Sequence, residues 1–261
     1  MRTPFLCTFN VMSPGTGDGS VRDWDHSGVG LDRYANTVFR YGFVPTLFVS
    51  GECARAHAPM LDEYRERGAE IGLFVAPSTT LDAKKSTQMG KIAREEQAHH
   101  LATGMALFQQ YLGFRPTALR TGLYSANHDT YAVAAAAFFT HICTRLPGAA
   151  LPVIGTVWPD DATIEVQHGL VDVPVTTNPA EKLFNRFPLY LAADVGKTPS
   201  HLSLIERGRE AGHICMSGGT NADYWDIDGI SLANLEAILR TVMDDPGIYA
   251  ATVSEIAAPA R

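Results

Sequence analysis

Two polar residues that could do chemistry, Asn10 and Arg120, stand within apolar, strand-like runs of this sequence. Asn10 lies near the end of Phe5–Val11, and Arg120 lies within Ala118–Tyr124. An amide donates and accepts hydrogen bonds but takes up no proton at neutral pH, whereas a guanidinium can grip a carboxylate or phosphate with two donors. Asn10 therefore lines a binding pocket in one interpretation and forms a simple turn in the other.

A metal site could form in the loop that follows the first apolar run. This loop carries three carboxylates and one imidazole, namely Asp18, Asp23, Asp25 and His26. Such a ligand set suits a divalent metal such as zinc, cobalt or manganese. Solvated loop charges are the alternative interpretation. Ser13 and Asp18 stand in the Gly-rich part of the loop, where they could contact a ligand or belong to a flexible lid.

A sugar-binding wall is a further hypothesis, built from residues that follow the run containing Arg120 and from one distant tryptophan. Its members are Tyr124, Ser125, Asn127 and Trp225. Aromatic faces can stack on the C–H surface of a pyranose, while hydroxyl and amide groups can bind its hydroxyls. For Trp225, packing in the protein core is the alternative.

Short apolar runs alternate with segments of helical period over the whole chain. The predicted strands are Phe5–Val11, Val44–Ser50, Glu70–Ala76, Ala118–Tyr124, Phe139–Leu146, Leu170–Thr176, His213–Ser217 and Tyr249–Val253. Continuous apolar character is typical of a parallel sheet covered on both faces. We therefore expect an α/β fold, a single distorted (β/α) barrel of about seven parallel strands, which forms one domain over residues 1–261.

The predicted helices must hold these strands in place. The longest is Thr87–Leu112, and Ser231 is expected to cap a later one. Gly42, Gly68 and Gly113 each follow a helical stretch, where a residue with positive φ is commonly needed. In such a barrel the chemistry sits at the carboxyl ends of the strands, which is where Asn10 and Arg120 are expected.

Composition limits the class of partner. The 261 residues are 46% hydrophobic and carry a net charge of −7, without a basic run that could follow a phosphate backbone. We therefore expect no nucleic-acid partner. The N-terminus has no apolar leader and no apolar stretch reaches the ~18 residues of a membrane helix, so we expect a cytoplasmic location and no membrane insertion. The four dispersed cysteines predict a reduced core.

Four motifs, in order along the chain, resemble those of the polysaccharide deacetylases, the NodB-homology family of carbohydrate esterases. Thr8–Asn10 is similar to the family's Thr-Phe-Asp motif, and the stretch that leads to Phe74 is similar to its Gly-x-Glu-Ile-Gly motif. The resemblance covers roughly residues 5–145 and is carried by Thr8–Asn10, Gly42–Gly51, Gly68–Leu73, and Arg115–Pro116 with Arg120–Ser125.

The resemblance implies a metal held by Asp, His and His, a second Asp as catalytic base, and an arginine that orients the base. The base corresponds here to Asn10 and the arginine to Arg120. The two histidines correspond to Phe74 and Ala76, or to Ser78 under a longer spacing. The metal aspartate would fall at Val11 or Met12. Since phenyl and methyl groups offer no lone pair, we expect no cofactor at the family site, and a divalent metal only at a relocated site.

By resemblance, the protein belongs to surface-polysaccharide biosynthesis of the O-antigen type. It would remove an acetyl group from an N-acetylated sugar although the usual metal ligands are lost. The alternative is a catalytically inactive pseudoenzyme that binds a carbohydrate or a partner. The implied ligands are an N-acetylated sugar, a nucleotide sugar or a lipid-linked glycan, and a second copy of the chain or a partner enzyme could also bind. Whether the protein is an enzyme stays open.

Overall fold

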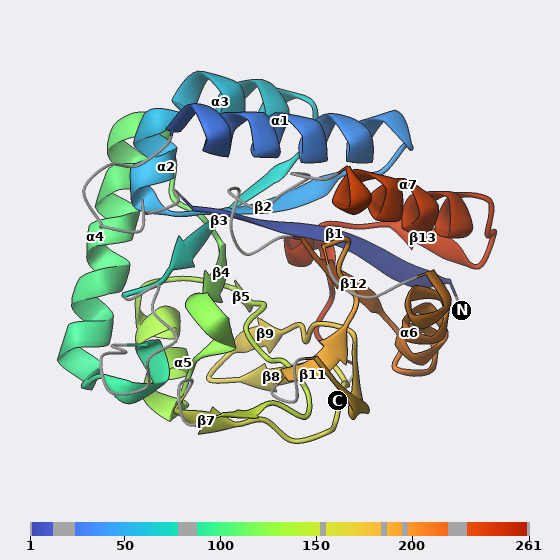
Figure 1. The fold of residues 1–261 in the computed structure, drawn as a ribbon. Helices are drawn as coiled ribbons and strands as arrows, with labels where there is room; N and C mark the ends of the chain where they lie inside the picture. The colour runs from blue at the N-terminus through green and yellow to red at the C-terminus, as the bar shows by residue number, and fades with distance from the viewer. Residues whose placement is uncertain are drawn as a thin grey trace.

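The computed structural model describes residues 2–12, 24–77, 88–151, 155–183, 187–194, 198–218 and 229–259. Within these residues, most strands form one curled sheet (Figure 1). Its strands are β1 (Thr3–Val11), β2 (Pro45–Val49), β3 (Glu70–Val75), β4 (Ala118–Thr121), β5 (His141–Ile142), β8 (Glu165–Gln167), β9 (Leu170–Asp172), β12 (Ile214–Ser217) and β13 (Ile248–Ala250). The strand order is β12-β1-β2-β3-β4-β5-β9-β8, with β13 also paired to β1.

The strands from β12 to β9 are all parallel to their neighbours, which confirms the predicted sheet of about seven parallel strands. The antiparallel edge strand β8 was not predicted. The register pairs Thr8 with Ser217, and Phe74 with Arg120. The carboxyl ends of β1, β3, β4 and β12 therefore lie at the same end of the sheet.

Residues between the strands join the two edges of the curled sheet. The Thr176 amide donates to the carbonyl of Cys215 at 3.1 Å, and the Leu191 amide donates to the carbonyl of Thr176 at 2.9 Å. The Ser217 amide in turn donates to the carbonyl of Leu191 at 2.9 Å. These bonds place the segment after β9 beside β12, so the sheet forms the distorted barrel that the sequence predicts.

Helices cover the outside of the sheet (Figure 1). They are α1 (Trp24–Arg40), α2 (Gly51–Ala56), α3 (Ala58–Glu66), α4 (Arg94–Leu112), α5 (His128–Ala136), α6 (Thr198–Glu210) and α7 (Ile230–Met243). Helix α4 approaches β3 closely at Gly104, where an added Cβ would lie 2.9 Å from a methyl group of Leu73. None of the helices described here combines the length and the apolar character that crossing a membrane requires.

Several element boundaries differ from the sequence prediction. Helix α4 begins at Arg94 because Ala93 is extended, and Met89–Lys91 forms a separate 3-10 turn. Ser231 lies buried inside α7, whose N-cap is Gly229 in the left-handed region, so the predicted serine cap is wrong. Gly42, Gly68 and Gly113 all have the expected positive φ.

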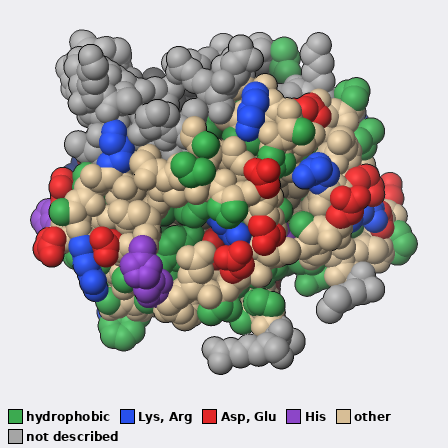
Figure 2. Space-filling model, turned by 90° about the horizontal axis from the view of Figure 1, so that it is seen from below, with side chains coloured by type: hydrophobic (Ala, Val, Ile, Leu, Met, Phe, Trp, Pro, Cys, Tyr) green, Lys and Arg blue, Asp and Glu red, His purple; other side chains and the backbone are tan. Residues whose placement is uncertain are grey.

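Two small antiparallel hairpins were not predicted. One pairs β6 (Ala150–Leu151) with β7 (Thr156–Val157), and the other pairs β10 (Thr177–Leu183) with β11 (Phe187–Tyr190). On the face shown in Figure 2, basic side chains are interspersed with acidic ones. This mixture agrees with the mixed-sign charges of the sequence.

Candidate functional site

Three strand ends bring polar side chains together inside the barrel. The guanidinium Nη1 of Arg120, on β4, donates to Asn10 Oδ1 on β1 at 3.2 Å and to Ser217 Oγ on β12 at 3.4 Å. All three residues are buried. The structure therefore joins Asn10 and Arg120, the two residues singled out first in the sequence, with Ser217, which ends another predicted strand.

The remaining donors of Arg120 bind the residue that follows β5. Its Nε donates to the carbonyl of Cys143 at 2.8 Å, and Nη2 donates to the Cys143 sulfur at 2.8 Å. The guanidinium also lies over the Phe48 ring, 4.4 Å from its centroid. Burial lowers the pKa of Arg120. The negative charge that Cys143 and other neighbours can carry raises it by more, so the net pKa is raised and Arg120 stays a cation.

The chain after β4 turns sharply and carries Tyr124 towards this cluster. Leu123 and Tyr124 both have positive φ, at 52° and 56°, which is costly for non-glycine residues and is common near functional sites. The Tyr124 hydroxyl lies 2.6 Å from Ser217 Oγ, and Trp158 Nε1 donates to the Tyr124 carbonyl at 2.8 Å. Burial raises the pKa of the Tyr124 phenol to about 12, so it stays protonated at neutral pH.

Two other residues of the predicted sugar wall, Ser125 and Asn127, have structural partners. Ser125 Oγ accepts a hydrogen bond from the Gly90 amide at 2.9 Å. Asn127 caps α5, since its side chain accepts from the Thr130 amide at 3.0 Å. Trp225 lies outside the described residues. Ligand binding by these three residues stays a prediction.

The positions corresponding to the metal-binding histidines lie at the end of β3. Phe74 is buried, and Ala76 directly follows the strand. Gly122 packs against both: an added Cβ there would lie 2.6 Å from Ala76 Cβ and 3.6 Å from Phe74 Cζ. Carbon atoms therefore fill this corner of the barrel, and together with the amide of Asn10 they do not form a donor set that fits a divalent metal.

The relocated metal site can be assessed only in part. Ser13, Asp18, Asp23 and the alternative position Ser78 lie outside the described residues, as does the side chain of His26. Asp25 is exposed in the first turn of α1, which begins at Trp24, so the expected loop ends before Asp25. Among the residues that the structure describes, no group of three or more His, Cys, Asp or Glu side chains could hold a metal ion.

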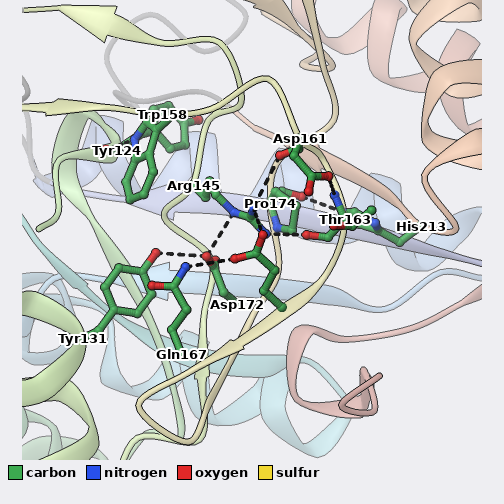
Figure 3. A network of polar contacts seen from close by, with 11 residues as sticks. Tyr124, Tyr131, Arg145, Trp158, Asp161, Thr163, Gln167, Asp172, Pro174 and His213 are labelled. Atoms are coloured by element: carbon green, nitrogen blue, oxygen red, sulfur yellow. Dashed lines mark hydrogen bonds and ion pairs between the residues drawn. The ribbon is translucent and has the colours of Figure 1, made fainter. Parts of the chain in front are cut away.

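Sequence reasoning missed a buried ion pair on the β9 side of the barrel (Figure 3). Arg145 Nε lies 3.0 Å from Asp172 Oδ2, and the Tyr131 hydroxyl donates to the same oxygen at 3.0 Å. Glu165 Oε1 accepts from Arg145 Nη1 at 3.0 Å. Burial raises the pKa of Asp172 to about 6, and Arg145 offsets part of that rise. Arg145 thus links the segment after β5 to β8 and β9, and Tyr131 links helix α5 to β9.

Asp194 is a second carboxylate that sequence reasoning missed. It follows the apolar run Leu189–Ala193, so the rule that polar residues end buried strands could have found it. Within the described part of the chain its Oδ1 is buried without a hydrogen-bond partner. Burial raises its pKa to about 6, and its charge in turn raises the pKa values of Tyr124 and Tyr190.

The curled parallel sheet with polar residues at its strand ends defines the class of fold, a distorted (β/α) barrel. No family model and no curated protein matches this sequence. Solved structures do. A Mycobacterium smegmatis protein assigned as a polysaccharide deacetylase covers 97% of this chain and 88% of its own, with a TM-score of 0.68 and 15% identity.

Two further structures show what else this fold carries. Puue allantoinase covers 97% of this chain and 88% of its own, with a TM-score of 0.63 and 13% identity. A mutant of a CE4 family pseudoenzyme with restored enzymatic activity covers 97% of this chain and 67% of its own, with a TM-score of 0.55 and 8% identity. At these identities the likeness shows the fold, which confirms the fold that the resemblance implied.

Proposed function

We propose that this protein binds an N-acetylated sugar, carried on a nucleotide or a lipid, in surface-polysaccharide biosynthesis of the O-antigen type. The observation that carries the proposal is the buried cluster of Asn10, Arg120 and Ser217 at the strand ends. Amide and hydroxyl groups suit the acetamide and hydroxyls of such a sugar, and a guanidinium suits the phosphate of its carrier. The sugar-biosynthesis role rests on the resemblance of the motifs.

The residues at the family's catalytic and metal-binding positions favour binding of the sugar without hydrolysis by the usual metal-dependent route. Asn10 cannot act as a base at neutral pH, and Phe74 and Ala76 present only carbon atoms. A CE4 pseudoenzyme shares this fold, which supports the proposal that the fold can lack activity. Because the cluster is buried, a ligand must displace covering groups to reach it, and we expect slow association.

Calorimetric titration with matched nucleotide sugars tests this proposal. We expect saturable binding of UDP-N-acetylglucosamine and at least tenfold weaker binding of UDP-glucose, which has a hydroxyl in place of the acetamide. Ser217→Ala should weaken binding about fivefold, the equivalent of one hydrogen bond of about 1 kcal/mol. Asn36→Ala is the matched control, because Asn36 lies on the outer surface of α1 and contacts Asp32 and Arg67.

Two results would contradict the proposal. If neither N-acetylated nucleotide sugars nor N-acetylated lipid-linked sugars bind, the barrel mouth is not a sugar site. If the protein releases acetate from such sugars in the presence of zinc, cobalt or manganese, and chelator stops the release, the protein is a deacetylase with a relocated metal. Asp23, Asp25 and His26 would then be the first ligands to substitute.

A further inference from the structure

Two cysteines from distant strands meet inside the barrel. Cys143 follows β5 and Cys215 lies on β12, near opposite edges of the curled sheet. Their sulfur atoms lie 3.7 Å apart, and both side chains are fully buried. No role in sugar binding requires this contact.

Arg120 makes the two sulfurs unequal. Its Nη2 donates to Cys143 Sγ at 2.8 Å, whereas the Arg120 charge lowers the pKa of Cys215 less than burial and the bond to Cys143 raise it. Burial raises the pKa of the Cys143 thiol, but the hydrogen bond from Cys215 and the Arg120 charge outweigh it, so the pKa is lowered. The pKa of Cys215 is raised by its bond to Cys143 and by burial. Cys143 therefore loses its proton more readily than Cys215.

Cys7 shows that burial alone does not lower the pKa of a thiol. It lies on β1 and is as buried as the pair. Burial raises the pKa of its thiol. Since the thiolate is the reactive form, Cys7 should be inert where Cys143 is reactive.

We propose that Cys143 and Cys215 form a redox-active dithiol, which hydrogen peroxide converts into a disulfide across the barrel, and that this oxidation frees Arg120 to bind a ligand anion. The release of Arg120 to bind an anion rests on the function proposed above. The formation of the disulfide depends only on the two sulfurs and the guanidinium.

The reaction balances in two steps. The Cys143 thiolate attacks one peroxide oxygen, the O–O bond breaks, and hydroxide leaves, so that Cys143 becomes a sulfenic acid. Cys215 then attacks the Cys143 sulfur; an S–S bond forms, the S–O bond breaks, and hydroxide leaves. The proton of Cys215 and one from solvent convert both hydroxides to water. The cysteines lose two electrons and the peroxide gains them.

The geometry requires only a local movement. A disulfide has an S–S distance of about 2.0 Å, so the sulfurs must approach by about 1.7 Å from their 3.7 Å separation. Rotation of the two side chains supplies part of that approach, and peroxide is a small neutral oxidant suited to a buried site. After oxidation Arg120 loses the Cys143 sulfur as a charged partner but keeps Asn10, Ser217 and the Cys143 carbonyl.

Peptide mass mapping of the folded protein after peroxide treatment tests whether the disulfide forms. We expect a peptide pair joined through Cys143 and Cys215. Cys143→Ser and Cys215→Ser should each abolish that pair, while Cys7→Ser, the matched control, should leave its rate unchanged. Arg120→Met should slow oxidation at least tenfold, and Arg120→Lys, which keeps the charge, should retain most of the rate.

Two outcomes would overturn the dithiol. One is oxidation of Cys7 or Cys53 as fast as Cys143 in protein whose circular dichroism is unchanged. The other is the absence of the cross-linked peptide after full consumption of the Cys143 thiol. The release of Arg120 is tested separately, by titrating reduced and oxidised protein with UDP-N-acetylglucosamine. We expect tighter binding to the oxidised form. Equal binding refutes the link to Arg120. If neither form binds this sugar, the titration is repeated with other N-acetylated nucleotide sugars and with N-acetylated lipid-linked sugars, and no binding of any of them refutes the proposed function.

Discussion

Replacing Arg145 by Met should destabilise the protein strongly, because it leaves a buried carboxylate without its cation. Arg145 contacts Asp172 Oδ2 and Glu165 Oε1, each at 3.0 Å. Asp172 is fully buried, whereas the side chain of Glu165 is 38% exposed. Water screens the contact with Glu165, so that pair contributes little. The contact with Asp172 therefore dominates the effect.

The magnitude follows from the distance between the charges. At 3.0 Å and an effective dielectric constant of about 20, the attraction is about 5.5 kcal/mol. Breaking a buried pair by removing one partner typically costs about 3–5 kcal/mol. After the change Tyr131 is the one remaining hydrogen-bond partner of Asp172 in the described structure. We expect a loss of about 3–5 kcal/mol in the free energy of unfolding at pH 7.

The cost should depend on pH with a definite sign. Burial raises the pKa of Asp172 to about 6 in the folded protein, against about 3.9 when unfolded. The folded state thus holds this proton more tightly, so the contribution of Asp172 to stability falls as pH rises from about 4 to about 6. Without Arg145 its pKa rises further, since Arg145 lowers it. The cost of Arg145→Met should therefore be greater at pH 8 than at pH 5.

Urea unfolding at a series of pH values measures these effects. The matched control is the double variant Arg145→Met with Asp172→Asn, which removes both charges and leaves an oxygen that accepts from Tyr131. We expect it to recover most of the loss and to abolish the added dependence on pH. A single variant that costs less than about 1 kcal/mol, or a double variant less stable than the single one, would refute this account of the ion pair.

Two further predictions concern the barrel mouth. Tyr124→Phe removes a hydroxyl that lies 2.6 Å from Ser217 Oγ, so the free energy of unfolding should fall by about 1 kcal/mol in urea titration, and an unchanged value would contradict the contact. Asn10→Asp combined with Phe74→His and Ala76→His should make the protein retain zinc through dialysis, as measured by elemental analysis, whereas Asn10→Asp alone should not. If the triple variant gains no zinc even with a further Asp at position 11 or 12, the correspondence of these motifs is wrong.

The sequence predicted the barrel well because continuous apolar runs report burial. They do not report where a strand stops pairing. Phe139–Leu146 is buried over most of its length, yet only His141–Ile142 pairs as a strand, because the following residues turn to meet Arg120 and Asp172. The opposite error occurred at Thr177–Leu183, which forms a hairpin strand that the sequence analysis did not predict. Most of its side chains are polar and all but one are at least partly exposed, so no apolar pattern marks it.

The sequence predicted the first residues of the candidate site but not the contact between its two cysteines. The strand-end rule selected Asn10 and Arg120, which the structure joins at 3.2 Å. It could not select Cys143 and Cys215, because a cysteine in an apolar run is equally typical of a core residue. Their proximity depends on how the sheet curls, which brings β12 near the end of β5 although four strands lie between them in the sheet. Sequence spacing carries no information on that curvature.

The cysteine contact also explains how an arginine can be buried beside an amide. A fully buried guanidinium needs a compensating charge, and the resemblance leads one to expect a carboxylate where Asn10 stands. Asn10 supplies an acceptor but no charge, and Ser217 supplies only a hydroxyl. The Cys143 sulfur lies 2.8 Å from Nη2, and its lowered pKa makes it the nearest group that can carry a negative charge. If so, Cys143→Ser should cost more stability than Cys215→Ser, because only the former leaves Arg120 without a negative partner.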